Sequence, residues 1–314
     1  MPGPCVSYVV TVYNKAPYLP FVVAGLEAQA GDFAREFIFV DDGSSDESVA
    51  LLRELTAAWP ERRIIEQANR GPAIALNAGL AAARGDYIKT LDGDDMLTPG
   101  ATAALLDAVK AGPAGFAFGA GASYLPAEGL EAAQRRAQAC RFSGAVELVP
   151  DALRATLRRA QTTTSSWLAR AELVRGVHGC DDGVFVQDYS IELRLSQATP
   201  FARVPMVVYL QPSTAPGRQS EQQAQELHDL NLAVARFVER SARLPPSLRR
   251  YALRRTAGRA WHYARRQAGK SYASREFWRY AAAQLGLGRA DADAIYATCE
   301  IFRGTSPIRL LDAP

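Results

Sequence analysis

The first hundred residues alternate between strand-like and helix-like segments, and this alternation limits the fold more than any other feature. Short runs rich in β-branched and aromatic residues recur at 6–13, 37–40, 64–65 and 86–91, and such runs are typical of buried strands. Segments with helical spacing or high alanine content, such as 71–83, separate them. Strands separated by helices predict a parallel sheet covered by helices.

Two of the predicted helices have start signals. Ser44 and Glu47 have the spacing of a capping box before an apolar periodic segment, which predicts that a helix begins there. Pro99 after Thr98 predicts a second start, because proline fits the first turn of a helix. The middle of the chain is less regular, and there we expect a strand over 161–167.

Polar residues follow the carboxyl ends of three predicted strands. Residues 13–14 (Tyr-Asn) follow the first, 41–42 (Asp-Asp) the second and 92–95 (Asp-Gly-Asp-Asp) the fourth. Ligands of open α/β sheets bind beyond the carboxyl ends of the strands. We therefore expect a ligand site at this edge.

The acidic cluster at 92–95 needs a compensating charge. Asp92, Asp94 and Asp95 repel one another and raise one another's pKa values unless something positive lies nearby. Mg²⁺ and Mn²⁺ prefer carboxylate oxygens and bind through one or two of them together with substrate phosphates. The alternative is a solvated turn whose negative charge favours the start of the next helix. The cluster alone leaves both interpretations open.

Five groups of residues together resemble a known family. They are Thr-Val-Tyr-Asn at 11–14, Val-Asp-Asp-Gly-Ser-Ser-Asp at 40–46, Asn-Arg-Gly at 69–71 with Asn-Ala-Gly at 77–79, Gly-Asp-Tyr-Ile at 85–88 and Leu-Asp-Gly-Asp-Asp at 91–95. In order and spacing they resemble the family 2 glycosyltransferases of the GT-A fold. The resemblance extends over about residues 5–212 and is dense up to about 100. It implies an α/β fold with a mixed, mostly parallel central sheet flanked by helices, followed by a C-terminal helical appendage.

The resemblance also implies an activity and a donor site. The chain is expected to transfer a sugar from a nucleoside diphosphate sugar, most often UDP-linked, to a hydroxyl of a glycan or lipid-linked acceptor. In this family Thr11 and Tyr13 would line the nucleobase pocket beside Asn14, and either Asp41 or Asp42 would accept a hydrogen bond from the base.

The acidic cluster would then hold the other end of the donor. By resemblance Asp92 would lie near the ribose and the metal, Gly93 would belong to the donor site, and Asp94 would bind the cation, Mn²⁺ or Mg²⁺. Asp95 is expected to be structural. Departure of the diphosphate develops negative charge, which a bound cation offsets.

An inverting transfer also needs a base that takes the proton of the acceptor hydroxyl. Asp188 is the candidate, because it lies in a segment that resembles the family's Glu-Asp segment at the start of a helix, with Gln187 in place of the glutamate. Asp181 and Asp182 are nearby competitors. A helix N-cap is the structural alternative for Asp188.

Some positions depart from the family pattern. Leu76 stands where many relatives have an arginine, and Arg70 could replace that contact. No histidine follows the strand that leads to Gln211, so Gln211 or water would take the place of a histidine ligand. We expect His178, His228 and His262 to be surface or core residues.

The chain divides into three expected parts. Residues 1–100 form the nucleotide-sugar half and 101–215 the acceptor half of one GT-A domain, and 216–314 form a basic helical region. Pro212, Pro216 and Gly217 mark the boundary between the last two parts.

The last part is strongly basic. Residues 241–314 hold 14 Lys and Arg against 5 Asp and Glu, and 241–270 hold 9 basic residues and no acidic ones. A basic helix with aromatic residues can lie on an anionic membrane surface, which would suit a lipid-linked acceptor. The alternative is a helical cap that packs on the catalytic domain. No recognised nucleic-acid module accompanies the basic residues, so nucleic acid is not an expected partner.

The remaining features restrict the class of protein. The N-terminal residues show neither a basic leader nor a long apolar stretch, which predicts a cytoplasmic enzyme, with peripheral attachment to the inner face of the membrane as an option. The four cysteines are widely separated, which favours buried thiols over a zinc site or disulfides.

Two other functions compete with glycosyl transfer. A sugar-nucleotide pyrophosphorylase would need a glycine-rich basic loop after the first strand, where this chain has Val-Tyr-Asn-Lys-Ala-Pro at 12–17. A non-catalytic scaffold or membrane adaptor of the same fold would have no need for Asp92, Asp94 and Asp188 together.

Overall fold

The computed structural model describes residues 3–213 and 223–311, so Pro216 and Gly217 of the expected boundary lie outside the described residues. The chain divides into two compact units whose segments alternate along the sequence. The first is Met1–Ala152, Thr162–Cys180 and Leu195–Pro216, and the second is Leu153–Gln161, Asp181–Arg194 and Gly217–Pro314. The three-part division expected from the sequence stays a prediction.

In the described residues, the first unit is built on a nine-stranded sheet whose first half is parallel. In it β1 (Cys5–Val12) lies between β2 (Ala34–Asp41) and β4 (Tyr87–Asp92), and β3 (Arg62–Glu66) pairs with β2 at the edge. The four strands overlap the four runs of strand-forming residues in the sequence. The prediction of a parallel βα arrangement is confirmed for this half.

The other half of the sheet is mixed. The strand β8 (Trp167–Arg170) pairs antiparallel with β4 and with β6 (Phe116–Tyr124), and β6 pairs parallel with β9 (Phe201–Pro212). The short β5 (Met96–Leu97) and β7 (Glu147–Val149) pair antiparallel with β9. The predicted fold class, a mixed and mostly parallel sheet flanked by helices, is confirmed.

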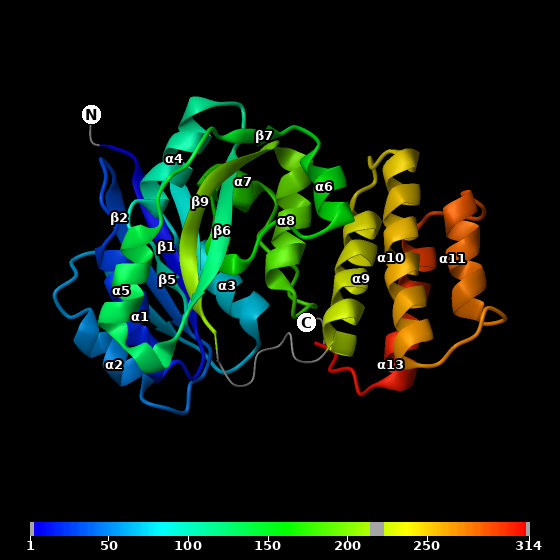
Figure 1. Ribbon diagram of the computed structural model, residues 1–314, viewed down its shortest axis with the longest axis horizontal. Coiled ribbons are helices and arrows are strands. Elements are labelled where there is room, and N and C mark those ends of the chain that lie inside the picture. Colours follow the sequence, from blue (N-terminus) through cyan, green and yellow to red (C-terminus); the bar gives the residue numbers. More distant parts are fainter. Residues whose placement is uncertain (1–2, 214–222, 312–314) are drawn as a thin grey trace. The chain divides into compact units, whose positions relative to one another are not determined.

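Helices cover both faces of the sheet (Figure 1). Because side chains of a strand point alternately to the two faces, Val6, Tyr8 and Val10 of β1 share one core, which includes residues of α1 (Leu19–Glu27), α2 (Ser48–Leu55) and α4 (Ala101–Ala111). On the opposite face α3 (Pro72–Ala82) packs on β1 and β2. A Cβ atom at Gly79 would lie 2.4 Å from Cγ1 of Val9, so this glycine permits the close approach of α3.

The predicted capping box at Ser44 and Glu47 is wrong. The N-cap of α2 is Glu47, which makes no side-chain capping bond. Ser44 Oγ instead accepts a hydrogen bond from the Asn14 backbone N–H at 2.9 Å, and Asp46 Oδ1 accepts one from the N–H of Ser48 at 3.0 Å. The hydroxyl joins two loops, and a neighbouring carboxylate satisfies the free donor of the helix.

Two other expectations need correction. The helix expected to start at Thr98-Pro99 begins at Ala101, with Gly100 as N-cap in the left-handed region at φ 77°. The strand expected over 161–167 is a short 3₁₀ turn at Thr164–Ser166 followed by β8. Ser165 is bonded to Lys89 and Asp92 of β4, and Thr163 Oγ1 donates a hydrogen bond to the Tyr209 hydroxyl of β9 at 2.9 Å.

The second unit is helical, as expected for the end of the chain. Its long helices α9 (Gln223–Arg240), α10 (Pro246–Gln267) and α11 (Arg275–Leu285) run side by side in Figure 1. Apolar residues of α9 form a core with Tyr189 and Leu193. The short α12 (Ala292–Tyr296) and α13 (Glu300–Thr305) follow.

The apolar residues of α10 lie inside the second unit. Trp261 and Tyr263 are buried and pack with Phe302 of α13 in one cluster. The side chains expected to meet a bilayer therefore contact protein, and the exposed residues of this helix are mainly its arginines. Within residues 3–213 and 223–311, none of the helices combines the length and apolarity of a membrane span.

The remaining elements are short. They are α5 (Leu130–Ala139), α6 (Ala152–Arg158), α7 (Ala171–Gly176), α8 (Gln187–Ala198) and the 3₁₀ turns Ala16–Tyr18, Pro126–Glu128 and Ala297–Cys299.

Candidate active site

The carboxyl edge of the parallel strands brings three predicted site residues together. Thr11 of β1 pairs with Val40 of β2 on one side and with Asp92 of β4 on the other, and Val12 pairs with Asp41. Neighbouring strands lie about 4.8 Å apart. Thr11, Asp41 and Asp92 consequently lie on three adjacent strands at one end of the sheet.

Asp41 and Asp42 are both buried but differ in their hydrogen bonds. Asp42 accepts bonds through both oxygens, from the Gln67 amide at 2.8 Å and from the backbone N–H groups of Arg70 and Gly71 at 3.0 and 2.8 Å. Asp41 Oδ2 accepts bonds from its own turn, whereas Asp41 Oδ1 is buried without a partner among the described residues. An unpaired buried acceptor is costly unless a ligand supplies a donor.

Asn14 organises the loop that follows β1. Its backbone is in the left-handed region at φ 51°, which asparagine tolerates. Its Oδ1 accepts a hydrogen bond from the N–H of Ser45 at 2.8 Å. These contacts join the loops after β1 and β2, and the Tyr13 side chain before Asn14 stays 48% exposed. An exposed aromatic ring at this edge is available to a planar ligand.

Gly93 allows the acidic cluster to approach the end of β1. A Cβ atom built on Gly93 would lie 2.6 Å from the Thr11 carbonyl oxygen and 3.2 Å from Cγ2 of Val12. The first contact is shorter than packed atoms allow, and the second is tighter than most such contacts. The glycine in Asp-Gly-Asp-Asp is thus required by backbone packing at the site.

A Gly93→Ala substitution should destabilise the chain by about 1–3 kcal/mol, because the added methyl group forces β1 and β4 apart. Urea unfolding measures this free energy. Gly112→Ala is the matched control, since a Cβ atom at Gly112 meets nothing within 4 Å. Equal stability of the two variants would contradict the packing argument.

Asp94 is paired with a lysine. Lys15 Nζ lies 2.6 Å from Asp94 Oδ2, and both side chains are partly exposed. The Tyr124 hydroxyl donates a hydrogen bond to the Asp94 backbone oxygen at 3.1 Å, which fixes the turn. The carboxylate therefore has one cationic neighbour from the loop after β1 and remains accessible to a ligand.

Asp95 belongs to a buried polar network beneath the cluster. Burial, together with the charges of Asp92 and Asp94, raises the pKa of Asp95 well above its ordinary value. Burial lowers the pKa of the fully buried Lys89 to about 7, although the nearby Asp95 and Asp92 oppose this shift. Lys89 Nζ donates to the Ser165 carbonyl at 2.7 Å, and the Asp92 N–H donates to Ser165 Oγ at 2.9 Å. This network fixes the backbone under the cluster and agrees with a structural role for Asp95.

Asp92 and Asp94 are the residues that would hold a divalent cation. Among the described residues, no group of three or more His, Cys, Asp or Glu side chains is placed to bind a metal ion. Ions that also bind a substrate diphosphate take only one or two carboxylates from the protein. Two hard oxygen donors separated by a close-packed glycine fit such an ion, and Lys15 supplies a positive charge to the cluster when no ion is bound.

Asp188 lies in the first turn of α8, within the second unit. Burial raises the pKa of Asp188 to about 6, and the charge of Glu226 acts in the same direction, whereas the bond from the Tyr189 N–H at 2.8 Å opposes it. A carboxylate whose pKa lies near the working pH is suited to proton transfer.

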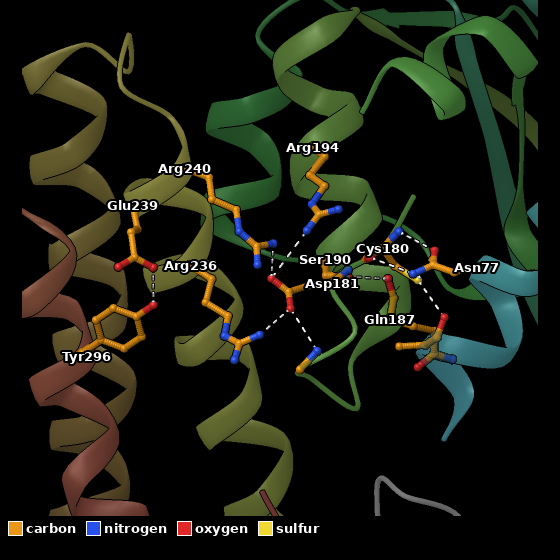
Figure 2. Close-up of polar contacts among 12 residues, drawn as sticks. Asn77, Cys180, Asp181, Gln187, Ser190, Arg194, Arg236, Glu239, Arg240 and Tyr296 are labelled. Carbon is orange, nitrogen blue, oxygen red and sulfur yellow. Dashed lines mark hydrogen bonds and ion pairs between the residues drawn. The ribbon is translucent and has the colours of Figure 1, made fainter. Parts of the chain in front are cut away.

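Asp181 does not compete with Asp188 for this role. Its carboxylate is bound by Arg236 at 2.6 Å, Arg240 at 2.7 Å and Arg194 at 3.5 Å, as Figure 2 shows. The Gly183 N–H, Arg236 and Arg240 hold the pKa of Asp181 below its ordinary value despite burial. A clamped anion of this kind serves as a structural charge.

Asn77 of the predicted Asn-Ala-Gly motif has a structural contact. Its amide oxygen accepts a hydrogen bond from the Cys180 N–H at 2.9 Å, and its amide nitrogen donates to the Cys180 carbonyl at 3.0 Å (Figure 2). The motif therefore ties α3 to the chain that follows α7.

The structure gives the positions of the residues that differ from the family pattern. Leu76 is buried on α3 and Arg70 is exposed in the loop before this helix, while Gln211 is near the end of β9. His228 is a core residue, as expected, because its Nδ1 lies 2.7 Å from Asp229 and its Nε2 accepts a hydrogen bond from Arg303.

Sequence reasoning missed Lys15, Lys89 and Ser165. The position of Lys15 could have been used, because it directly follows the polar residues at the end of the first strand. A lysine there can reach carboxylates that follow the neighbouring strand, such as Asp94. The sequence shows Lys89 only as one residue of a predicted strand. Ser165 is 73 positions from Asp92, so only the folded structure brings the two residues into contact.

Comparison with known proteins identifies several similar proteins and a family whose sequence model matches this chain. The family model described as "Glycosyl transferase family 2" matches residues 7–164 of this chain. The succinoglycan biosynthesis protein ExoO of Rhizobium meliloti is 41% identical over 99 residues, which are 31% of this chain and 27% of ExoO. The chain spans less than a third of the length of the curated relatives it matches.

Solved structures share the fold over nearly the whole chain. TarS of S. aureus in complex with UDP-GlcNAc aligns with a TM-score of 0.63 at 12% identity, over 95% of this chain and 91% of that one. The mannosyltransferase PcManGT of Pyrobaculum calidifontis, solved with GDP-Man and Mn²⁺, aligns with a TM-score of 0.58 at 17% identity, over 96% and 86%. At these identities the likeness concerns the fold alone.

Proposed function

The chain belongs to glycosyl transferase family 2, and we propose that it is a metal-dependent, inverting enzyme that uses a UDP-linked sugar. The acceptor in this proposal is a hydroxyl of a glycan or lipid-linked molecule of polysaccharide synthesis. The observation that carries the proposal is the edge formed by Thr11, Asp41 and Asp92, where Asp41 Oδ1 is a buried acceptor without a partner among the described residues.

At the nucleobase end, Asp41 is the residue we assign to the base. Uracil has one imide N–H, which is the donor that Asp41 Oδ1 lacks. Thr11 and the exposed Tyr13 ring would line the pocket. Asp42 and Asn14 would shape it through the loops they hold, because their side-chain oxygens already accept hydrogen bonds from those loops.

At the diphosphate end, Asp92 and Asp94 would hold Mn²⁺ or Mg²⁺, and Gly93 keeps them against β1. The bound cation supplies charge stabilisation for the departing diphosphate. Lys15 would contribute a further positive charge at the same place, since its ammonium group already lies against Asp94.

Asp188 would accept the proton of the attacking hydroxyl. Its raised pKa keeps it basic enough to accept a proton at neutral pH while it remains ionised there. In an inverting transfer the oxygen attacks the anomeric carbon as the bond to the diphosphate breaks, and the proton passes to the carboxylate.

The similar proteins support parts of this proposal. TarS was solved with UDP-GlcNAc, and PcManGT was solved with GDP-Man and Mn²⁺. These complexes favour a nucleotide-sugar donor and a cation for this chain. The name of ExoO favours polysaccharide synthesis. Membrane binding by residues 241–270 would rest mainly on exposed arginines, because Trp261 and Tyr263 of α10 are buried and its other large apolar side chains are partly buried.

A thermal-shift screen of nucleoside diphosphates and nucleotide sugars, with and without Mn²⁺, tests the proposal. A ligand that binds only the folded chain raises its melting temperature by mass action. UDP and a UDP-sugar should give the largest shifts, and only with the cation. A shift with nucleoside triphosphates alone would favour a pyrophosphorylase, and no shift with any nucleotide would favour a scaffold.

An Asp41→Asn substitution should change the preferred base. The asparagine oxygen can accept the bonds from Gly43 and Ser44, which leaves its NH₂ group where Oδ1 now lies. We expect UDP affinity to fall about tenfold or more, because the imide N–H would then face a donor, while CDP, which presents a ring-nitrogen acceptor, should gain. Calorimetric titration with both nucleotides measures this, and an unchanged ratio would exclude Asp41 from base recognition.

A further inference from the structure

The second unit contains a pocket of about 300 Å³ whose lining includes none of the residues assigned above to the donor, the cation or the base. Arg236, Arg303 and Arg309 line it, and Asp229 is the one carboxylate among its lining residues in the described part of the chain. Its apolar lining includes Phe185 and Leu232. The pocket therefore combines several cations with an apolar wall.

Two of the three arginines have no carboxylate partner in the described part of the chain. Arg236 is paired with Asp181. Arg303 and Arg309 form no ion pair with any described residue. Two guanidinium groups that line one pocket repel each other, and Asp229 is not ion-paired with either of them, so an anionic ligand would stabilise them.

Arg303 is held in place by a buried histidine. Its Nε donates a hydrogen bond to His228 Nε2 at 2.9 Å, which requires neutral His228 with its proton on Nδ1. That proton points to Asp229 Oδ1 at 2.7 Å. Within residues 3–213 and 223–311, the two terminal nitrogens of Arg303 have no acceptor and are available to a ligand.

Arg309 is held through its backbone. Its N–H donates to Gln225 Oε1 at 2.8 Å, and its carbonyl accepts from Gln225 Nε2 at 3.0 Å. Its guanidinium group lies 5.2 Å from the centre of the Phe185 ring. The backbone bonds and the ring contact thus fix the position of the cation, and no described residue accepts a hydrogen bond from its guanidinium group.

Asp229 does not neutralise these cations directly. Its Oδ1 is bound to His228, and its Oδ2 accepts bonds from the Phe185 N–H at 3.2 Å and from Gln225 at 3.0 Å. Both oxygens are occupied, and the residue is buried. Its role is to fix the walls of the pocket.

The pocket adjoins the segment that carries Asp188. Phe185 precedes Asp188 by three residues, and Asp229 binds the Phe185 backbone. Glu226, one position from Gln225 on α9, is the residue whose charge acts on Asp188. An anion in the pocket would therefore be bound by the same helix and the same turn that position the proposed base.

We propose that this pocket binds a phosphate ester group of the acceptor, an assignment that rests on the proposed function. The planar fork of arginine matches phosphate oxygens in pairs, and the apolar wall suits the organic group of an ester. The acceptor is then phosphorylated, and its phosphate positions the attacking hydroxyl relative to Asp188.

Calorimetric titration of the full chain with inorganic phosphate and with phenyl phosphate tests this inference. EDTA in the buffer removes free divalent cations, so phosphate cannot bind through a cation at the proposed donor site. Phenyl phosphate should bind several-fold more tightly than inorganic phosphate, since its ring buries apolar surface. Arg309→Ala and Arg303→Ala should each weaken binding of phenyl phosphate about tenfold, and Arg309→Ala leaves the backbone bonds to Gln225 in place. Arg243→Ala, which removes an exposed arginine outside the pocket, should have no effect.

The outcomes separate this inference from the proposed function. UDP binding with Mn²⁺ should be unchanged in Arg309→Ala. If UDP binds but phenyl phosphate binds the wild type and both pocket variants equally, the pocket is not a phosphate site. If inorganic phosphate binds as tightly as the ester, the pocket is a site for free anion and the acceptor assignment is wrong. Failure of UDP to bind at all would refute the donor site instead.

Discussion

An Asp94→Asn protein should bind UDP in the presence of Mn²⁺ no more tightly than the wild type does without the cation. The substitution keeps the size of the side chain but removes the negative charge that we assign to the metal. Loss of groups that merely orient metal ligands lowers metal affinity 10- to 100-fold, so loss of a ligand should lower the Mn²⁺-dependent UDP affinity by about 100-fold or more. Calorimetric titration with UDP at fixed Mn²⁺ measures it.

The control for this substitution is Asp86→Asn, at the other end of the strand. Asp86 Oδ2 accepts a hydrogen bond from the Cys5 N–H at 2.9 Å, at the amino end of β4. The chemical change is the same, and we expect UDP affinity to stay within about twofold of the wild type, because substitutions away from a site have small effects. An Asp94→Asn protein that retains Mn²⁺-dependent affinity would remove Asp94 from the metal site.

The parallel half of the fold could be predicted because its strands carry their own signal. Residues 37–40 are apolar on both faces, as is typical of a strand between two helical layers, and β2 forms there. Residues 86–91 include Lys89 and Thr90, but the run of strand-forming residues still marks β4. The start of α2 could not be predicted from Ser44, since its hydroxyl bonds to Asn14, 30 residues away. Local capping signals fail where a tertiary partner takes the same side chain.

The edge of the candidate site was predictable for the same reason, but the division of labour within it was not. The carboxyl ends of adjacent parallel strands must meet, which brings Thr11, Asp41 and Asp92 together. Which of Asp41 and Asp42 keeps a free oxygen depends on the loop that contains Arg70 and Gly71, and this loop folds back on Asp42.

The basic tail shows a different limit of sequence reasoning. The pattern around Trp261 and Tyr263 describes an amphipathic helix, and such a pattern is the same whether the apolar face meets lipid or protein. Both side chains are buried in the second unit. The pocket with Arg303 and Arg309 also combines residues from separate segments of the chain. It therefore could not be predicted from the spacing of residues within one segment.

An Asp188→Asn protein should lose sugar transfer by about 10²–10⁴-fold, the range expected when a general base is removed, and should bind UDP with unchanged affinity. For the wild type, kcat/KM should rise with pH through about 6 and level off above it, because the carboxylate must be ionised to accept a proton. The asparagine variant should lack this rise. Initial rates of UDP release at several pH values measure both effects.

The neighbouring Asp182→Asn is the matched control and should transfer at the wild-type rate. Stability then separates a base from a structural carboxylate. Burial raises the pKa of Asp188 above its unfolded value, so ionising it costs stability above about pH 6, and this cost disappears below about pH 4. At pH 7 the Asp188→Asn chain should therefore be at least as stable as the wild type in urea, with the difference vanishing in acid. An Asp188→Asn variant that is less stable at pH 7 would assign Asp188 to the structure of α8, and a loss of transfer of the same size in Asp182→Asn would make Asp182 the competing candidate for the base.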